Sequence, residues 1–246
     1  MDEIFSRNEL FWGESSQKLL SQKHVAVFGL GGVGGYCAEM LARAGVGELT
    51  VVDFDVVSKS NINRQILALH STLNQSKAEL TQNRLLDINP KLKLNVVDQF
   101  YQDDFSFKDI DYVADAIDTM RSKVNLLQHC VNENIPVVSS FGAGNRMDPT
   151  KLYVCDISEI KDKKSPFISN LLYQLSKKRV NCGIKVVASS EKPKSLEKII
   201  TEEHISLDNG EQLNFKKVVP ASTPFVASTC GIIMAYCVIN DFLCYN

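Results

Sequence analysis

The sequence lacks the features that mark several large classes of protein. Its seven cysteines include no C-x-x-C pair, and there is no internal repeat or low-complexity tract. Because C-x-x-C pairs are the usual signature of structural zinc, we expect no zinc-binding subdomain of that kind. The apolar run 225–239 has about 15 residues, fewer than the ~20 that span a bilayer. We therefore expect no membrane contact.

The sequence also lacks a large excess of either positive or negative charge. The net charge is −2, and 44% of the 246 residues are hydrophobic, which is enough for a full core. The first seven residues are mixed and polar, unlike a signal peptide, so we expect a reduced, cytoplasmic protein. Cys230, Cys237 and Cys244 recur every seven residues, and this spacing predicts buried positions on one face of a C-terminal helix.

Apolar strand-like segments alternate with helical ones up to Gly144. Strands are predicted at 24–30, 48–54, 94–97, 112–117 and 136–141, and helices at 15–22, 33–44, 76–87 and 120–134. Near-continuous apolar strands that alternate with helices are typical of a parallel sheet covered on both faces. The sequence thus predicts an α/β fold, with a doubly wound, Rossmann-like and mostly parallel sheet in a single domain, 1–246.

The pattern changes after Gly144. Strands are predicted at 151–157 and 184–189, helices at 168–178 and 222–240, and irregular structure at 161–165 and 189–213. The stretch 161–198 holds ten Lys or Arg and three Asp or Glu, a local charge of +7 that leaves −9 on the rest. We expect 157–218 to form a basic helical insertion with a surface for a polyanion, or simply a solvated pair of lysine-rich helices.

A glycine loop follows the first predicted strand. Gly29, Gly31 and Gly34 form a G-x-G-x-x-G pattern, with Gly32 beside them, and the next strand ends at Asp53. Such glycines allow a tight turn, close approach of a phosphate and close helix packing, while the aspartate can bind a ribose. The loop alone does not distinguish NAD, FAD or S-adenosylmethionine from ATP, and a purely structural turn is the alternative.

Polar residues that follow the second predicted strand in the sequence distinguish between these ligands. A hydride-transfer enzyme has no need of a cation there, whereas attack of a carboxylate on the α-phosphate of ATP builds negative charge that fixed cations and Mg²⁺ must neutralise. Arg64 and Lys77 can supply the cations, and Asn61 and Gln65 can donate amide hydrogens. Asp118 ends a later strand at the edge where ligands bind, and its carboxylate can hold Mg²⁺.

In combination these motifs resemble the ubiquitin-activating-enzyme superfamily, which includes the bacterial activators of the molybdopterin and thiamin sulfur carriers. The resemblance implies an adenylating domain with catalytic Arg64, Lys77 and Asp118. It implies that ATP is bound by the glycine loop and by Asp53, Asp55, Asn61, Asn63, Arg64, Gln65, Lys77 and Asp118, with Mg²⁺ on Asp118. Members are homodimers or pseudodimers in which an N-terminal arginine reaches the neighbour's ATP site. Arg7 is the candidate for that role, and a solvated terminal charge is the alternative.

The region after Gly144 looks like the tRNA threonylcarbamoyladenosine dehydratases, in "FGAGNRMDPTKLYVCDI", "DKKSPFISNLLYQLSKKRV" and "VVASSEKP". This resemblance implies ATP-dependent cyclisation of the modified adenosine next to the tRNA anticodon. We expect Lys177, Lys178 and Arg179 to contact the tRNA. A structural monovalent cation and a cysteine desulfurase or sulfur acceptor, with Cys182 as the outlying cysteine, are further candidates.

Three other functions stay open. The first is an activator of a ubiquitin-like sulfur carrier, which would adenylate a protein ending in Gly-Gly without RNA. The second is an NAD oxidoreductase, which would leave Arg64 and Lys77 without a role. The third is a scaffold that binds nucleotide without catalysis.

Overall fold

The computed structural model describes residues 3–102, 104–161, 165–196, 199–206 and 212–244. The helices are α1 (Ser6–Trp12), α2 (Glu14–Leu20), α3 (Gly34–Ala44), α4 (Lys77–Ile88), α5 (Met120–Asn132), α6 (Pro166–Lys177) and α7 (Pro224–Leu243). The strands are β1 (His24–Phe28), β2 (Glu48–Val52), β3 (Lys93–Val97), β4 (Tyr112–Asp115), β5 (Val137–Phe141), β6 (Leu152–Asp156), β7 (Lys185–Ser189), β8 (Ile199–Ser206) and β9 (Gln212–Val219). Short 3-10 turns occur at Glu3–Phe5, Lys59–Asn61, His70–Thr72, Pro149–Lys151 and Ile157–Glu159.

Seven strands form one sheet in the order β3-β2-β1-β4-β5-β7-β6. All neighbours pair in parallel except β6, which pairs antiparallel with β7. The order reverses direction beside β1, so the carboxyl ends of β1 and β4 border the crevice in which ligands bind in open α/β sheets. The predicted doubly wound, Rossmann-like and mostly parallel sheet is confirmed.

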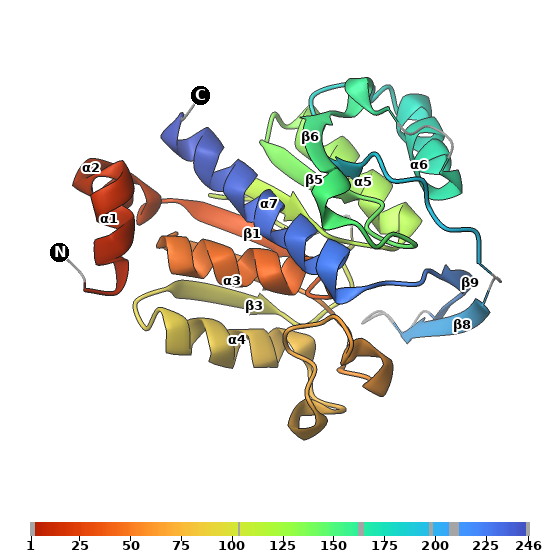
Figure 1. Cartoon of the computed structure of the whole chain (residues 1–246), viewed down its shortest axis with the longest axis horizontal. Helices are drawn as coiled ribbons and strands as arrows, with labels where there is room; N and C mark the ends of the chain where they lie inside the picture. The colour runs from red at the N-terminus through yellow and green to blue at the C-terminus, as the bar shows by residue number, and fades with distance from the viewer. Residues whose placement is uncertain (1–2, 103, 162–164, 197–198, 207–211, 245–246) are drawn as a thin grey trace.

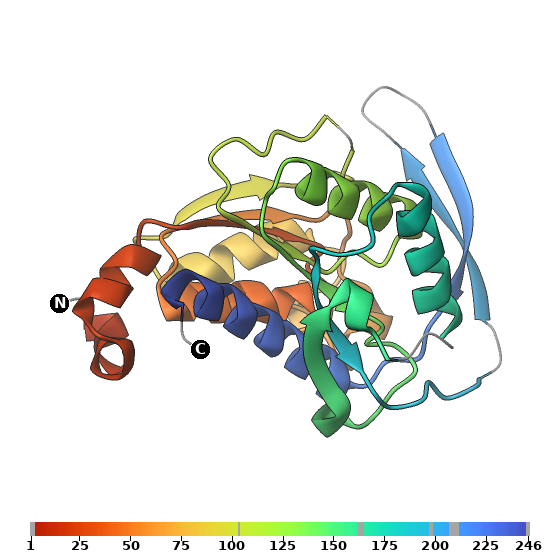
Figure 2. The ribbon, with the colours of Figure 1, turned by 90° about the horizontal axis from the view of Figure 1, so that it is seen from above.

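Helices cover both faces of this sheet, and the three layers are visible in Figures 1 and 2. On one face α3, α4 and α7 pack over a core that takes Val25 and Val27 from β1. On the other face α5 and α6 pack over a core that takes Ala26 and Phe28 from the same strand. Because successive side chains of a strand point to opposite faces, a strand buried on both sides must be apolar at every position.

The last helix, α7, is longer than the apolar run that predicts it. Its 20 residues are long and apolar enough to cross a membrane by length and composition alone, but 44% of the most apolar window is buried inside the structure. Cys230 and Cys237 are buried in it, as the seven-residue spacing predicts. Cys244 is exposed, because the helix ends at Leu243 and Cys244 takes a left-handed conformation there.

The expectation of irregular structure at 189–213 holds for 190–196 but is wrong for 199–206 and 212–213. Strands β8 and β9 form a separate antiparallel hairpin in the register Ile199↔Val219 to Ser206↔Gln212. In Figures 1 and 2 this hairpin projects from the body of the molecule, at the side opposite α1 and α2. Within the described residues the predicted insertion, 157–218, contains the 12-residue helix α6 together with β7, which belongs to the main sheet, and most of the hairpin, so it is less helical than expected.

Candidate functional site

The glycine loop connects β1 to α3 at the carboxyl edge of the sheet. Gly29 has a φ of 85°, in the left-handed region that favours glycine. A Cβ on Gly34 would lie 1.7 Å from the carbonyl oxygen of Gly29, so only glycine fits there. At Gly31 a Cβ would meet only Nε2 of Gln65, at 3.6 Å. The loop is therefore closed around Gly29 and Gly34 but open at Gly31, where an anion can approach the N-terminus of α3.

Asp53 braces this loop from the end of β2. Its Oδ2 accepts a hydrogen bond from the backbone N–H of Leu30 at 2.5 Å, and its Oδ1 accepts one from Asp55 at 2.8 Å. Burial raises the pKa of the Asp53 carboxyl, although the charge of Lys77 and the two N–H donors oppose the shift. The side chain is 8% exposed. Contact between Asp53 and a ribose stays a prediction.

Lys77 lies at the start of α4 and is paired with Asp55. Its Nζ is 2.7 Å from Oδ2 of Asp55, and its backbone N–H donates to the carbonyl of Asp55 at 3.0 Å. The lysine is 4% exposed, whereas the Asp55 side chain is 48% exposed. A buried ammonium is thus held at the carboxyl edge by an accessible carboxylate.

Arg64 lies across the glycine loop and faces Asp118. Its Nη1 donates to the Ser60 carbonyl and to Oδ1 of Asn63, both at 2.9 Å. Its Cγ would lie 3.2 Å from a Cβ on Gly32, so the arginine stem packs directly on the loop. Burial lowers the pKa of the guanidinium, and the nearby charge of Asp118 opposes this shift. Arg64, Asp118 and the loop are therefore brought together, as the sequence predicts.

The three predicted amides have different surroundings. Asn61 accepts a hydrogen bond from the N–H of Ser58 at 3.1 Å and so closes its own turn. Asn63 donates from Nδ2 to the Ser222 carbonyl at 2.9 Å, tying its loop to the segment before α7. Gln65 is 7% exposed, and within the described chain its buried Oε1 has no hydrogen-bond partner. A nucleotide contact of any of the three stays a prediction, and Gln65 has an acceptor left for one.

Asp118 follows β4 in the turn before α5 and is exposed. The described residues contain no group of three or more His, Cys, Asp or Glu that could cage a metal ion. Mg²⁺ commonly binds one or two carboxylates together with substrate phosphates and keeps several waters. A single carboxylate opposite the open glycine loop fits that donor set. The expected monovalent cation stays a prediction.

Arg7 is exposed on α1 and is not brought near its own glycine loop. The neighbouring Asn8 donates to the carbonyl of Arg43, in the last turn of α3, at 2.9 Å. The glycine loop lies at the other end of α3, and 11 residues of helix span about 16 Å. Figure 1 shows α1 and α2 at the side of the molecule away from that loop.

Lys177, Lys178 and Arg179 are exposed at the C-terminal end of α6. Nζ of Lys177 lies 4.3 Å from the centre of the Tyr173 ring. The start of α6 is at the carboxyl edge, where Cδ1 of Ile168 would lie 3.3 Å from a Cβ on Gly142. The three cations are thus at the opposite end of a 12-residue helix, about 18 Å long, from the glycine-loop edge.

Sequence reasoning missed a buried arginine at this edge. Arg146 is 3% exposed and donates to the carbonyl oxygens of Gly142 and Gly144, and to that of Glu191 at 3.0 Å. The Glu191 carboxylate in turn accepts from the N–H of Asp148 at 2.9 Å. These bonds fix the loop after β5 against the end of β7. This arginine ends the string "FGAGNR", in which no spacing rule distinguishes it from a surface residue.

A cavity of about 360 Å³ opens beyond the ends of β2 and β3. Its lining is partly aromatic and partly polar: Val52, Val97, Gln99, Phe100, Tyr101, Gln102, Asp104 and Phe105. The Phe54 and Phe100 rings meet edge to face, with their centres 5.1 Å apart. A larger hollow of about 400 Å³ lies at the amino ends of β4 and β7, remote from the glycine loop. The smaller cavity is the one beside Asp53, and its size and lining suit a nucleobase.

Comparison with known proteins gives one consistent result. A model of the ThiF family matches residues 5–240. The tRNA threonylcarbamoyladenosine dehydratase of Bacillus subtilis (strain 168) is 38% identical over 97% of this chain and 94% of that protein. The molybdopterin-synthase adenylyltransferase of Escherichia coli (strain K12) is 36% identical, but the match covers only 54% of this chain and 53% of that protein.

The solved structures agree with the sequences. The E. coli tRNA N6-threonylcarbamoyladenosine dehydratase TcdA in complex with ATP superposes with a TM-score of 0.83 at 29% identity, over 98% of this chain and 94% of that one. Its complex with AMP gives a TM-score of 0.84 at 28% identity, with the same coverage. The likeness to the dehydratases covers nearly the whole chain, whereas the match to the sulfur-carrier activator covers about half of it.

Proposed function

This chain belongs to the ThiF family, and we propose that it is an ATP-dependent tRNA threonylcarbamoyladenosine dehydratase. The observation that carries the proposal is the match to dehydratases across nearly the whole length of both proteins. The carboxyl-edge site supports it, because Arg64, Lys77 and Asp118 are the charges that adenylation of a carboxylate requires.

The proposed reaction has two steps. The free carboxylate of the threonylcarbamoyl group attacks the α-phosphorus of ATP, and pyrophosphate leaves. A nucleophilic atom of the same modification then attacks the resulting acyl-adenylate, closing a ring as it loses a proton and expels AMP. One carboxylate oxygen leaves with AMP, so the modification has lost the elements of water. Because both reacting ends belong to one side chain, ring closure is unimolecular and needs no protein nucleophile.

Each charged residue has a distinct task in the first step. Arg64, over the glycine loop, would stabilise the charge that develops on the α-phosphoryl oxygens. Lys77, which Asp55 holds in place, would neutralise the departing pyrophosphate. Asp118 would hold Mg²⁺, which neutralises phosphate charge when bound. The open backbone at Gly31 would receive a phosphate at the N-terminus of α3.

The nucleoside end of ATP has room beside Asp53. We expect the adenine in the 360 Å³ cavity past β2 and β3, next to Phe100 and Phe105. The Oε1 of Gln65 has no partner within the described residues, so it could accept a hydrogen bond from a hydroxyl or N–H of bound nucleotide or substrate. A buried acceptor that gains a partner only on binding favours the bound state.

We further propose that the protein works as a homodimer. Leu10 and Phe11 of α1 are 85% and 80% exposed, and Phe225, Ile232 and Tyr236 of α7 are 54%, 43% and 62% exposed. Large apolar side chains grouped on two helices are typical of an interface. A partner covering α1 would also place Arg7 against another subunit, which offers this arginine a site that its own chain does not. A cysteine desulfurase or sulfur acceptor as partner stays a prediction, with exposed Cys182 as the cysteine to test.

Activation of a sulfur carrier is the second candidate. The match to a molybdopterin-synthase adenylyltransferase favours it, but that match covers only about half of either chain. Both functions share ATP and adenylation and differ in what carries the carboxylate. A dehydratase releases AMP only with modified tRNA, whereas an activator exchanges pyrophosphate with a protein that ends in Gly-Gly.

The decisive experiment combines purified protein, ATP–Mg²⁺ and tRNA carrying threonylcarbamoyladenosine. Digestion and mass spectrometry should then find a nucleoside lighter by one water, together with AMP. The matched control is the same tRNA without the modification. If the modified nucleoside keeps its mass while a Gly-Gly carrier supports exchange, the second function replaces the first.

A further inference from the structure

One buried ion pair lies beneath the site without facing the reactants. Lys123 is in the first turn of α5, and Asp115 is the last residue of β4. Both side chains are 0% exposed, and Nζ of the lysine is 2.6 Å from Oδ2 of the aspartate. The same oxygen accepts a hydrogen bond at 2.5 Å from Oγ of Ser139, on the neighbouring strand β5. The pair thus joins a helix to two strands of the sheet.

Its two members hold the backbone of Ile117, the residue that precedes Asp118. Oδ1 of Asp115 accepts a hydrogen bond from the N–H of Ile117 at 3.0 Å. Nζ of Lys123 donates to the carbonyl oxygen of Ile117 at 3.1 Å. Both backbone polar groups of Ile117 are therefore bonded to the ion pair, and the next residue along the chain is Asp118.

The same turn supports the glycine loop. A Cβ on Gly29 would lie 2.8 Å from the carbonyl oxygen of Ala116 and 3.2 Å from the backbone nitrogen of Ile117. A shift of this turn would therefore disturb the loop and the carboxylate together. Buried ion pairs are often no more stabilising than apolar groups of similar volume, so a role in geometry accounts better for two charges placed here.

We propose that Lys123 and Asp115 are positioning residues, which fix the turn so that the Asp118 carboxylate meets Mg²⁺ on the ATP phosphates. This inference rests on the proposed function, and in particular on Asp118 as the metal ligand. It predicts that loss of the pair weakens the contribution of Mg²⁺ to ATP binding rather than ATP binding as such. Residues that orient a metal ligand typically change metal affinity about 10- to 100-fold when replaced.

The test is calorimetric titration of ATP into the full chain, once with EDTA and once with Mg²⁺. The main variant is Asp115→Asn with Lys123→Met, which keeps side-chain volume and leaves no unpaired buried charge. We expect its ATP affinity in EDTA to equal that of the parent, and its gain in affinity on adding Mg²⁺ to fall about 10- to 100-fold. Asp118→Asn should lose the same gain, and adding the two neutral substitutions to it should cause no further loss.

Two further variants separate positioning from general stability. Ser139→Ala removes a single hydroxyl from the network and should show a smaller loss of the same kind. Lys23→Met breaks the half-buried pair with Asp111, 3.1 Å long at the opposite edge of the sheet, and should leave the gain in ATP affinity on adding Mg²⁺ unchanged.

The outcomes distinguish the inference from its premise. Suppose that Asp118→Asn loses the gain in ATP affinity on adding Mg²⁺ while the Asp115→Asn, Lys123→Met variant keeps it. The positioning role is then wrong, and the assignment of Asp118 as the metal ligand stands. If Asp118→Asn keeps the gain, the metal assignment and the inference both fail. Either result leaves the dehydratase activity to be judged by nucleoside analysis.

Discussion

At the scale of single residues, the proposed chemistry depends on two cations that the fold holds without neutralising them fully. Arg64 is oriented by the Ser60 carbonyl and by Asn63, both neutral acceptors, and Lys77 by one carboxylate. Positive charge that is already oriented stabilises a transition state without the cost of reorganising solvent. The sequence predicts this role for the two residues because adenylation needs fixed cations after the second strand, whereas hydride transfer does not.

The first prediction concerns these cations. Arg64→Ala and Lys77→Ala should each lower the rate of AMP formation by about 10²–10³-fold, because each removes charge aimed at the transition state. Pyrophosphate release in the presence of modified tRNA measures the rate. Lys108→Ala, at an exposed site on the amino side of β4, is the control and should keep parental activity. Equal rates for Arg64→Ala and the control would show that Arg64 does not face the triphosphate.

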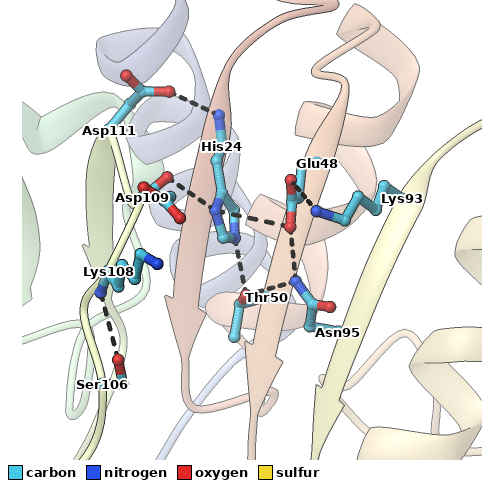
Figure 3. Close-up of polar contacts among 9 residues, drawn as sticks. All are labelled: His24, Glu48, Thr50, Lys93, Asn95, Ser106, Lys108, Asp109 and Asp111. Carbon is cyan, nitrogen blue, oxygen red and sulfur yellow. Dashed lines mark hydrogen bonds and ion pairs between the residues drawn. The ribbon is translucent and has the colours of Figure 1, made fainter.

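A second polar network lies at the opposite edge of the sheet and has no role in the proposed reaction. Figure 3 shows His24 between β2 and the segment that precedes β4. Its Nδ1 lies 2.9 Å from the Asp109 carbonyl and 3.7 Å from Oε1 of Glu48, and its Nε2 lies 2.8 Å from Oγ1 of Thr50. Glu48 also accepts hydrogen bonds from Lys93 and Asn95, both at 2.8 Å. The network ties together the amino ends of three strands.

This network predicts a contribution to acid sensitivity. Burial acts to raise the pKa of Glu48, but hydrogen bonds from Lys93 and Asn95 and the nearby His24 lower it below its ordinary value of 4.5. Since the folded pKa is below the unfolded one, the stabilisation is complete above pH 4.5 and is lost as the pH falls through the folded value. Melting temperatures from pH 7 to pH 3 should therefore fall less steeply for Glu48→Gln than for the parent. The control is Glu133→Gln, at an exposed carboxyl after α5, which should show the same dependence of melting temperature on pH as the parent. If Glu48→Gln also showed the parental dependence, the contribution of Glu48 to acid sensitivity would be refuted.

At the scale of elements, the glycine loop separates a folding requirement from a binding requirement. Gly34→Ala should destabilise the fold, because its Cβ would lie 1.7 Å from the Gly29 carbonyl, and such overpacking costs about 1–3 kcal/mol. Gly31→Ala should keep the melting temperature and weaken ATP binding, because its Cβ would meet only Gln65. Thermal melts and calorimetry on the two variants measure both effects. Normal ATP affinity in Gly31→Ala would mean that the phosphates lie elsewhere.

Elements that bury an apolar pattern could be predicted from the sequence, and elements without one could not. The strand at 24–28 and the helix at 34–44 carry continuous apolar or amphipathic patterns with glycines at their ends, and both were located within two residues. Among the described residues the β8–β9 hairpin pairs only with itself, outside the main sheet. Its strands, IITEEHIS and QLNFKKVV, lack the strict alternation of apolar and polar residues that predicts a half-buried strand. Arg179 has a φ of 62° after α6, where glycine is usual, so the end of that helix carried no clear signal.

The end of α6 carries the prediction about RNA. Replacing Lys177, Lys178 and Arg179 together by Ala should weaken tRNA binding and lower the slope of log affinity against log salt by up to about 2–3 units, since each phosphate contact contributes about 0.7–0.9. Filter binding at several salt concentrations measures the slope. The charge-matched control replaces three exposed lysines outside α6: Lys18 in α2, Lys91 before β3 and Lys108 before β4. If both triple variants lose the same slope, the tRNA contacts are spread over the surface rather than gathered on α6.

At the scale of the whole molecule, the fold places Arg7 far from the glycine loop, although the two are near each other in the sequence. Arg7 is about 20 residues before the glycine loop in sequence, yet a full helix length, about 16 Å along α3, divides them. No pattern in the sequence could reveal this distance, because it depends on how α1 packs against the far end of α3. The exposed Leu10 and Phe11 near Arg7 support the proposal that a second subunit covers this surface.

Subunit mixing tests whether Arg7 completes a site on the partner. Arg7→Ala and Arg64→Ala should each be nearly inactive as homodimers, because every site then lacks one of its two arginines. In a mixed dimer one site lacks both arginines, whereas the other pairs the intact Arg64 of one subunit with the intact Arg7 of its partner. After free exchange of equal amounts, half of the dimers are mixed and each has one working site, so about a quarter of the parental activity should return. Sedimentation must first show a dimer, and mixing Arg64→Ala with Lys77→Ala is the control: both positions belong to the same chain's site, so no activity should return. Activity that stays at the homodimer level after verified exchange would show that Arg7 acts within its own chain or not at all.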